Sequence, residues 1–71
     1  MERIRSGENR FGLVLTAIVF TELQADRFTI INGQRLAPGE RERTSGLEVQ
    51  SIERTSVVLA GEVERFRLVK D

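Results

Sequence analysis

Asp26-Arg-Phe-Thr-Ile-Ile-Asn-Gly-Gln-Arg-Leu-Ala-Pro-Gly-Glu40 is the stretch that decides the local architecture of this chain. Its Asn32-Gly33 pair lies between two runs with apolar residues, which is the strongest short-range signal for a β-hairpin. The type I′ turn of such a hairpin needs positive φ at both central residues, and Asn and Gly adopt that conformation most readily. We therefore expect short strands at 27–31 and 34–37. A second turn follows at Pro38-Gly39, because proline cannot donate to a ladder.

Short runs of β-branched and apolar residues recur on both sides of this hairpin, with turn signals between them. This spacing predicts an all-β fold of about six short antiparallel strands in a small two-sheet sandwich or half-open barrel. The strands expected outside the hairpin are 13–20, 47–52, 57–60 and 63–69, and the connection at 21–25 has room for one helical turn. Residues 1–12 are expected to form a flexible lead-in or linker, with a poorly paired first strand as the alternative. Residues 13–71 then form the small β domain.

The composition describes one small domain without a net charge. Its 71 residues can bury only ~60% of the surface of the unfolded chain. Eleven basic residues balance eleven acidic ones, which argues against nucleic acid or an anionic membrane as the main partner. Opposite signs alternate at 40–43 and 62–65, so the sequence predicts solvated faces rather than a like-charge patch. The longest uncharged run, 11–21, is too short for a transmembrane helix, and the polar N-terminus is not a signal peptide.

No residue pattern in the chain points to catalysis, and we expect no enzyme, no metal and no cofactor. Cys and His are absent, which removes thiol nucleophiles, imidazole bases and the usual zinc ligands. The carboxylate pairs Glu40/Glu42 and Glu62/Glu64 lie beside turns among arginines, and we interpret them as surface groups. The aromatic residues lie in or beside strand-like runs, and we interpret them as core rather than as a base-stacking platform: Phe11, Phe20, Phe28 and Phe66.

The run from Leu13 to Phe20 is apolar on both faces, which is unusual for a strand in a two-layer domain. One explanation is a central strand that is covered on both sides. The other is an exposed apolar edge, which soluble domains avoid unless a partner adds a strand to it. On the second explanation, we expect the partner to bind at Val14, Thr16, Ile18 and Phe20.

Three segments, taken in order, resemble a known family: RFTIINGQRLAPGE at 27–40, GLEVQSIE at 46–53 and VVLAGEVERFRL at 57–68. The resemblance is to the C-terminal periplasmic domain of type II secretion system assembly protein B, and it covers residues 13–69. The homology region of protein C of that system and the type IV pilus lipoprotein P have a similar layout. The resemblance assigns Asn32, Gly33, Pro38 and Gly39 to structural turns, and it assigns five residues to the core: Ile52, Val58, Leu59, Phe66 and Leu68. The charged loop 40–45 and the Thr55-Ser56 pair depart from the family pattern.

The resemblance implies a non-enzymatic interaction module in the periplasm, carried by an inner-membrane anchor that this chain lacks. Its expected partner is the N-terminal periplasmic domain of an outer-membrane secretin, with other inner-membrane secretion components as further partners. The alternative function is a self-associating structural module, a homodimer formed through an edge strand. A barrel that binds an oligonucleotide or a small ligand is a third hypothesis, and the neutral charge and scarce aromatic residues count against it.

Overall fold

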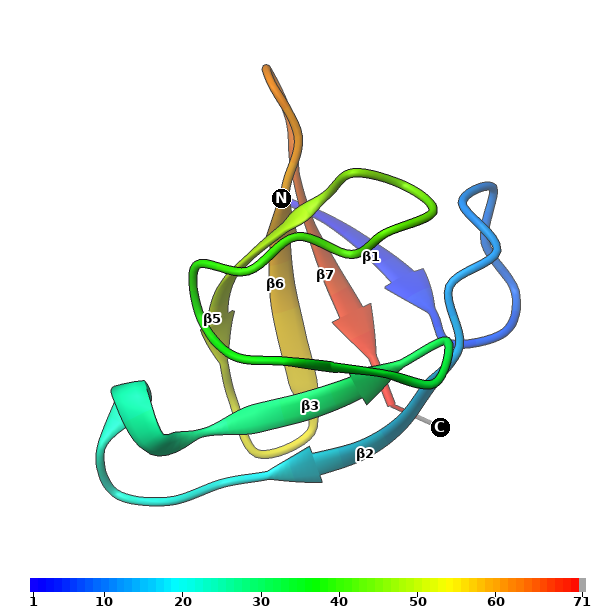
Figure 1. The fold of residues 1–71 in the computed structure, drawn as a ribbon. Coiled ribbons are helices and arrows are strands. Elements are labelled where there is room, and N and C mark those ends of the chain that lie inside the picture. The colour runs from blue at the N-terminus through cyan, green and yellow to red at the C-terminus, as the bar shows by residue number, and fades with distance from the viewer. Residues whose placement is uncertain (71) are drawn as a thin grey trace.

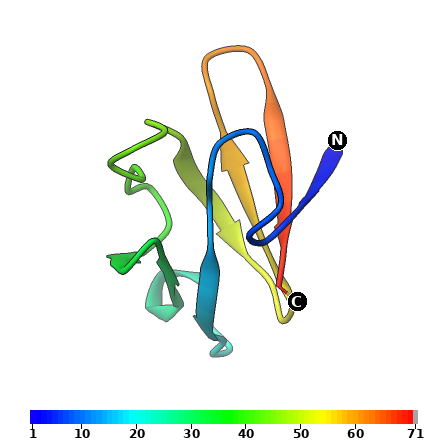
Figure 2. The same ribbon diagram turned by 90° about the vertical axis from the view of Figure 1, so that its right-hand side faces the viewer.

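The computed structural model describes residues 1–70, and these residues form two β-sheets that pack face to face (Figure 1). The four-stranded sheet has the order β1-β7-β6-β5, with β1 (Glu2–Arg5), β5 (Glu48–Ile52), β6 (Ser56–Ala60) and β7 (Arg65–Val69). The three-stranded sheet has the order β2-β3-β4, with β2 (Leu15–Val19), β3 (Phe28–Ile31) and β4 (Gln34–Leu36). A short 3-10 helix, η1 (Gln24–Asp26), separates β2 from β3. Figure 2 shows the sheets as two layers, and the all-β prediction is confirmed.

The fold differs from the sequence-based expectation at the N-terminus. Residues 1–70 contain seven strands rather than about six, because Glu2–Arg5 forms β1. β1 pairs with β7 in parallel, so the four-stranded sheet is mixed rather than purely antiparallel. Ile4 explains this pairing, because it lies opposite Leu68 and is only 6% exposed. A strand with one buried apolar side chain has a weak periodic signal, and a flexible lead-in is equally compatible with its sequence.

Most strands are shorter than expected, although β6 begins one residue earlier, at Ser56. The last strand begins at Arg65 rather than at Val63, which is 92% exposed in the β6–β7 turn. β2 covers Leu15–Val19 only, so Leu13 and Val14 lie in the connection that precedes it. The outer residues of these runs are apolar and therefore strand-like in sequence, but they have no partner strand beside them in the described part of the chain.

The Asn32-Gly33 turn has the predicted backbone conformation. Both residues have positive φ, 52° for Asn32 and 77° for Gly33. This two-residue turn sets the register of β3 against β4, in which Ile31 lies opposite Gln34 and Thr29 lies opposite Leu36. The turn at 38–39 is also present, with Gly39 at a φ of 95°.

Aliphatic side chains from both sheets fill the core. The five residues that the resemblance assigns to it are all buried, although Val58 lies outside the central cluster. The expectation for the aromatic residues is wrong in part, because only Phe66 is buried. Phe11 packs against Phe66 with ring centroids 4.9 Å apart, whereas Phe20 and Phe28 are half-buried under arginine side chains. The described domain has a radius of gyration of 10.6 Å, and Leu, Ile and Val fill most of this small interior.

Polar groups join the two sheets along both of their long margins, without closing a barrel. On one side, the Ser6 hydroxyl accepts from the Leu15 N–H at 2.8 Å, and the Ser6 N–H donates to Val69 O at 3.1 Å. On the other side, the segment after β4 runs along β5, with the Gly39 N–H 2.7 Å from Val49 O and the Val49 N–H 2.8 Å from Glu40 O. The architecture is therefore a sandwich whose two sheets are hydrogen-bonded to each other along both margins, and the bonds from Ser6 occupy the start of the β2 edge, at Leu15.

Candidate partner-binding surface

β2 lies at the edge of the three-stranded sheet, where it pairs only with β3. An edge strand presents backbone N–H and C=O groups that a partner strand can use. The start of this strand is held in place by the β3–β4 turn: Asn32 Oδ1 accepts from the Val14 N–H at 2.8 Å, and the Asn32 N–H donates to Val14 O at 2.9 Å. The Asn32-Gly33 turn therefore sets two features at once, the register of the hairpin and the position of the edge strand.

The pairing of β2 with β3 shifts register between Leu15 and Ala17, as at a β-bulge. Before the shift, Leu15 lies opposite the buried Ile31 and faces the core. After it, Ile18 lies opposite the buried Thr29 and packs against the core cluster. The strict alternation expected from the sequence is therefore wrong for this strand, and its second half turns the other way.

As a result, the four residues expected to bind the partner do not share one face. Val14 is 43% exposed, and Thr16 is exposed with its hydroxyl 3.4 Å from Ile30 O. Ile18 is half-buried against the core. Phe20 is half-buried and stacks between two guanidinium groups, with Arg27 3.9 Å and Arg54 4.5 Å from the ring centroid. A role for these residues in binding stays a prediction, and Val14 and Thr16 are the two that a partner can reach most directly.

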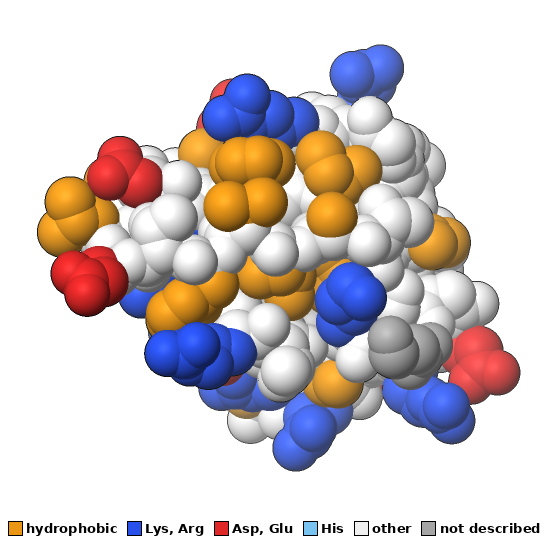
Figure 3. Space-filling view, turned by 90° about the horizontal axis from the view of Figure 1, so that it is seen from below, with side chains coloured by type: hydrophobic (Ala, Val, Ile, Leu, Met, Phe, Trp, Pro, Cys, Tyr) orange, Lys and Arg blue, Asp and Glu red, His pale blue; other side chains and the backbone are white. Residues whose placement is uncertain are grey.

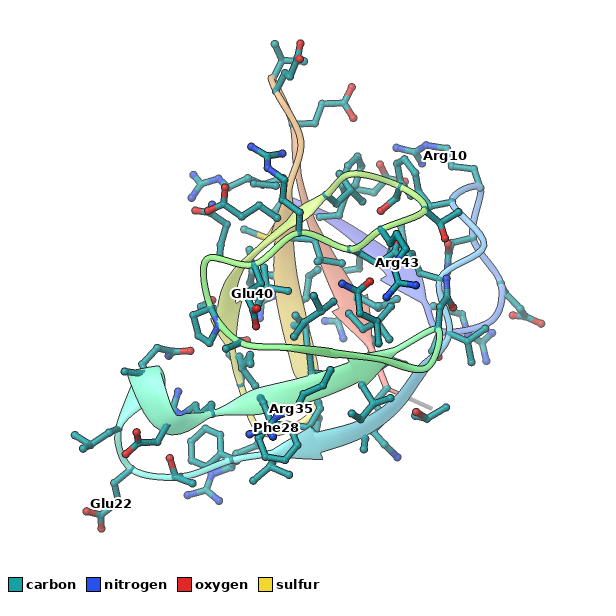
Figure 4. The ribbon with its side chains drawn as sticks, viewed as in Figure 1. Arg10, Glu22, Phe28, Arg35, Glu40 and Arg43 are labelled. Atoms are coloured by element: carbon teal, nitrogen blue, oxygen red, sulfur yellow. The ribbon has the colours of Figure 1, made fainter. Side chains whose placement is uncertain are left out.

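A different group of side chains lies on the outer side of the three-stranded sheet, and we call it the outer apolar face: Ala17, Val19, Phe28, Ile30 and Arg35. The bulge turns Ala17 and Val19 to this side, and regular alternation in β3 and β4 places the other three there. Val19 lies opposite Phe28, and Ala17 lies opposite Ile30, so the two pairs form adjacent cross-strand contacts on one side of the sheet. The Arg35 guanidinium stacks 4.1 Å from the Phe28 ring centroid, and Figure 4 shows the two side chains together. Figure 3 shows hydrophobic side chains gathered on the side of β2 and β3, with Lys and Arg side chains around them.

Sequence reasoning missed this face, although one signal for it was available. In a hairpin with a two-residue turn, Ile30 lies opposite Arg35, and the two side chains point to the same side. A charged residue at that position marks the solvent side, so Ile30 and its neighbour at i−2, Phe28, belong to the outer surface. The interpretation of Phe28 as core did not use this register.

The connection between β2 and β3 is fixed to the end of β5. The Arg27 side chain donates from Nε to Thr21 O at 2.7 Å and from Nη1 to Ile52 O at 2.8 Å. Gln24 Oε1 accepts from the Ile52 N–H at 2.7 Å. Both backbone polar groups of Ile52 are therefore bound by side chains from this connection, which holds the β2 end of the outer apolar face against the other sheet.

Glu42 corrects the expectation that all four paired glutamates are surface groups, because it is only 1% exposed. Burial raises the pKa of its carboxyl, but hydrogen bonds from the Thr44 and Ser45 N–H groups at 3.0 and 2.7 Å outweigh burial, and the net result is a lowered pKa. The main chain closes the same loop, with the Gly46 N–H donating to Glu42 O at 2.8 Å. An ionised carboxylate bound in this way caps a loop and has no proton to give as a general acid.

One hollow in the described part of the chain is smaller and more polar than an ordinary ligand site. A hollow of about 100 Å³ lies beside the β3–β4 turn, lined by Asn32, Gly33, Gln34, Glu42, Arg43 and Thr44. Ligand sites usually enclose ~300–1,000 Å³ and are mainly apolar. Within residues 1–70 there is no cluster of three potential metal ligands, and no helix is long and apolar enough to cross a membrane.

The fold and surface together define a small two-sheet β domain in which β2 is an edge strand with an apolar face beside it. Comparison with known families narrows this class. The family model for type II secretion system protein B matches residues 12–69, which is most of the chain, and the chain belongs to this family. The match gives it a role related to type II secretion. Searches of curated proteins and of solved structures gave no significant match.

Proposed function

We propose that this domain is a non-enzymatic interaction module of the periplasm, part of an inner-membrane-anchored protein, that binds the N-terminal domain of an outer-membrane secretin. Membership of the type II secretion system protein B family supports a role in this machinery. The observation that carries the binding proposal is the edge position of β2 beside exposed apolar side chains. Other inner-membrane secretion components are further candidate partners.

The chemistry of the edge favours strand addition. A partner strand placed beside β2 gains main-chain hydrogen bonds, and exposed side chains at the strand supply specificity. The backbone groups of Val14 are bound by Asn32 and those of Leu15 by the Ser6 hydroxyl, so the added strand would pair along the later part of β2. The exposed side chains of Val14 and Thr16 lie at the start of that strand. A strand edge that is already ordered loses little conformational entropy when a partner binds.

A titration of the labelled domain with secretin N-terminal domains tests the proposal. We expect chemical-shift changes at 14–20, and we expect Val14→Asp to weaken binding by about tenfold or more, because it places a charge against an apolar partner surface. Val63→Asp is the matched control, since Val63 is an exposed valine in the β6–β7 turn, away from β2. The absence of shift changes with several plausible secretins at high concentration, or equal losses for both variants, would remove the proposal.

The same edge also supports self-association, a homodimer in which β2 pairs with its copy. Sedimentation at several concentrations separates the two functions. A molecular mass that rises with concentration in wild type, and stays constant in Val14→Asp, favours the dimer. A constant monomer mass leaves secretin binding as the function of this edge.

A further inference from the structure

We propose that the outer face of β1 and β7 is a second interaction surface, separate from β2, that binds an acidic extended segment of a protein partner. This surface, the arginine face, consists of Arg3, Arg5, Arg65 and Arg67. Four of the eleven basic residues of the chain therefore lie on two adjacent strands. The proposal does not depend on secretin binding by β2.

Strand alternation builds this face. Ile4, Phe66 and Leu68 are buried and point to the core, so the residues between them in β1 and β7 point to the opposite side of the sheet. In the sequence, each arginine has an apolar or acidic neighbour, and the charges look mixed. In the sheet, the four arginine side chains point to one surface, and the residues next to them within each strand point to the other side. Figure 2 shows β1 and β7 side by side, on the side of the molecule away from β3 and β4.

The arrangement places like charges in direct opposition. Arg3 lies opposite Arg67 in the β1–β7 register. Like charges on directly opposed residues destabilise a sheet. Arg67 is partly neutralised by Glu53 and donates to the Ser56 hydroxyl at 3.2 Å, and Arg5 pairs with Glu8 at 3.4 Å. Arg3 and Arg65 have no ion pair with any residue in 1–70, and both are exposed. An anionic ligand would relieve the repulsion that the fold alone leaves in place.

The spacing of the four arginine positions along and between the strands fits an extended peptide. Arginines two residues apart on one strand are ~6.6 Å apart, and neighbouring strands are ~4.8 Å apart. Acidic residues at alternate positions of an extended segment repeat with the same ~6.6 Å period. Guanidinium groups also bind carboxylates in a two-point geometry that lysine does not offer. The complementary ligand is therefore a strand-like segment with Asp or Glu at every second residue.

Two other anionic partners fit less well. An anionic bilayer would repel Glu62 and Glu64, which flank the most exposed apolar residue beside this face, Val63 in the β6–β7 turn. Single-stranded nucleic acid binds through aromatic stacking in addition to charge. None of the four phenylalanines lies on the arginine face. Phe66 is buried and Phe11 packs on Phe66, whereas Phe20 and Phe28 lie on the side of the three-stranded sheet.

A synthetic peptide in which Glu and Thr alternate over about eight residues is the probe, because its length covers the strands of the face. The control titration uses a second peptide, which has Gln in place of every Glu. We expect chemical-shift changes in β1 and β7 with the Glu peptide only, and an affinity that falls as salt rises from about 0.01 M to about 0.15 M. The double variant Arg3→Gln/Arg65→Gln should bind about threefold or more weakly.

The matched control is Arg35→Gln/Arg43→Gln, which removes the same charge from exposed arginines of the three-stranded side. It should retain wild-type affinity. Equal binding of the Gln peptide, equal losses in both double variants, or shift changes outside β1 and β7 would overturn the proposal. Binding only to phosphatidylglycerol vesicles, or only to single-stranded DNA, would overturn it in favour of that partner.

Discussion

The outer apolar face and the arginine face lie on different sheets, and they show how the same strand periodicity produces opposite surface chemistry. On β2 and β3, alternation leaves Val19, Phe28 and Ile30 toward solvent. On β1 and β7, it leaves arginines. We expect binding at the first surface to depend on short-range apolar contact and on hydrogen bonds to the adjacent β2 edge, and binding at the second to depend on charge and to weaken with salt. The two proposed surfaces would therefore bind their partners through two independent kinds of interaction.

The largest expected effect comes from a substitution that leaves a cavity in the core between the two sheets. Leu68 is fully buried and lies between Ile4 of β1 and Val57 of β6. Leu68→Ala should lower the free energy of unfolding by about 2–5 kcal/mol, because it leaves a cavity that the sheet cannot close. Urea denaturation followed by circular dichroism measures the loss. A loss below about 1 kcal/mol would mean that β1 and β7 are not packed as described.

Glu42 offers a change confined to the loop between β4 and β5. Glu42→Gln should cost about 1.5–3 kcal/mol, since the buried carboxylate accepts charge-assisted hydrogen bonds from Thr44 and Ser45. The pKa of this carboxyl is lowered in the folded state. Its stabilising effect is therefore present above the ordinary pKa of glutamate and is lost as pH falls through the lower folded value.

The pH dependence separates this charge effect from a simple loss of packing. The free energy of unfolding of wild type should fall more steeply in acid than that of Glu42→Gln. Plotted against pH, the two free energies should approach each other below the glutamate pKa of 4.5. Parallel curves at all pH values would show that folding does not lower the pKa of Glu42. The arginine face should keep its peptide affinity in this variant.

Gly33 tests the link between the hairpin turn and the outer apolar face. Its φ of 77° is a conformation that alanine adopts only with strain. Gly33→Ala should therefore cost about 1–3 kcal/mol, although a Cβ at this position meets no atom within 4 Å. The expected chemical-shift changes lie in β3, β4 and the start of β2, where Asn32 holds Val14. Changes that extend equally into β1 and β7 would contradict the independence of the two faces.

The smallest expected effect concerns the arginine face itself. Arg3→Gln should leave stability unchanged or raise it by about 0.2–1 kcal/mol, because it removes one member of the opposed Arg3–Arg67 pair. The same variant should bind the acidic peptide more weakly. Thermal unfolding at low and high salt checks the first point, and the difference from wild type should shrink as salt screens the repulsion. A clear loss of stability would show that Arg3 is a structural residue.

Much of the fold was predictable where one residue type or a short pattern decides it. The Asn32-Gly33 turn and the burial of Ile52, Leu59 and Leu68 were predicted correctly. The candidate site was predictable only in part, because its position at the first apolar strand depends on alternation that the bulge interrupts. The arginine face was not predicted, since the expectation of mixed charges treated neighbours in sequence as neighbours on the surface.

By itself, the sequence determined the conformations that depend on local backbone chemistry, above all the positive-φ hairpin turn and the β preference of the apolar runs. The tertiary structure alone decided the parallel pairing of β1 with β7, the bulge in β2 and the burial of Glu42. Each of these depends on groups that are distant in the chain or on the space between two sheets. Local propensity carries no information about such contacts, and only the packed fold brings their partners together.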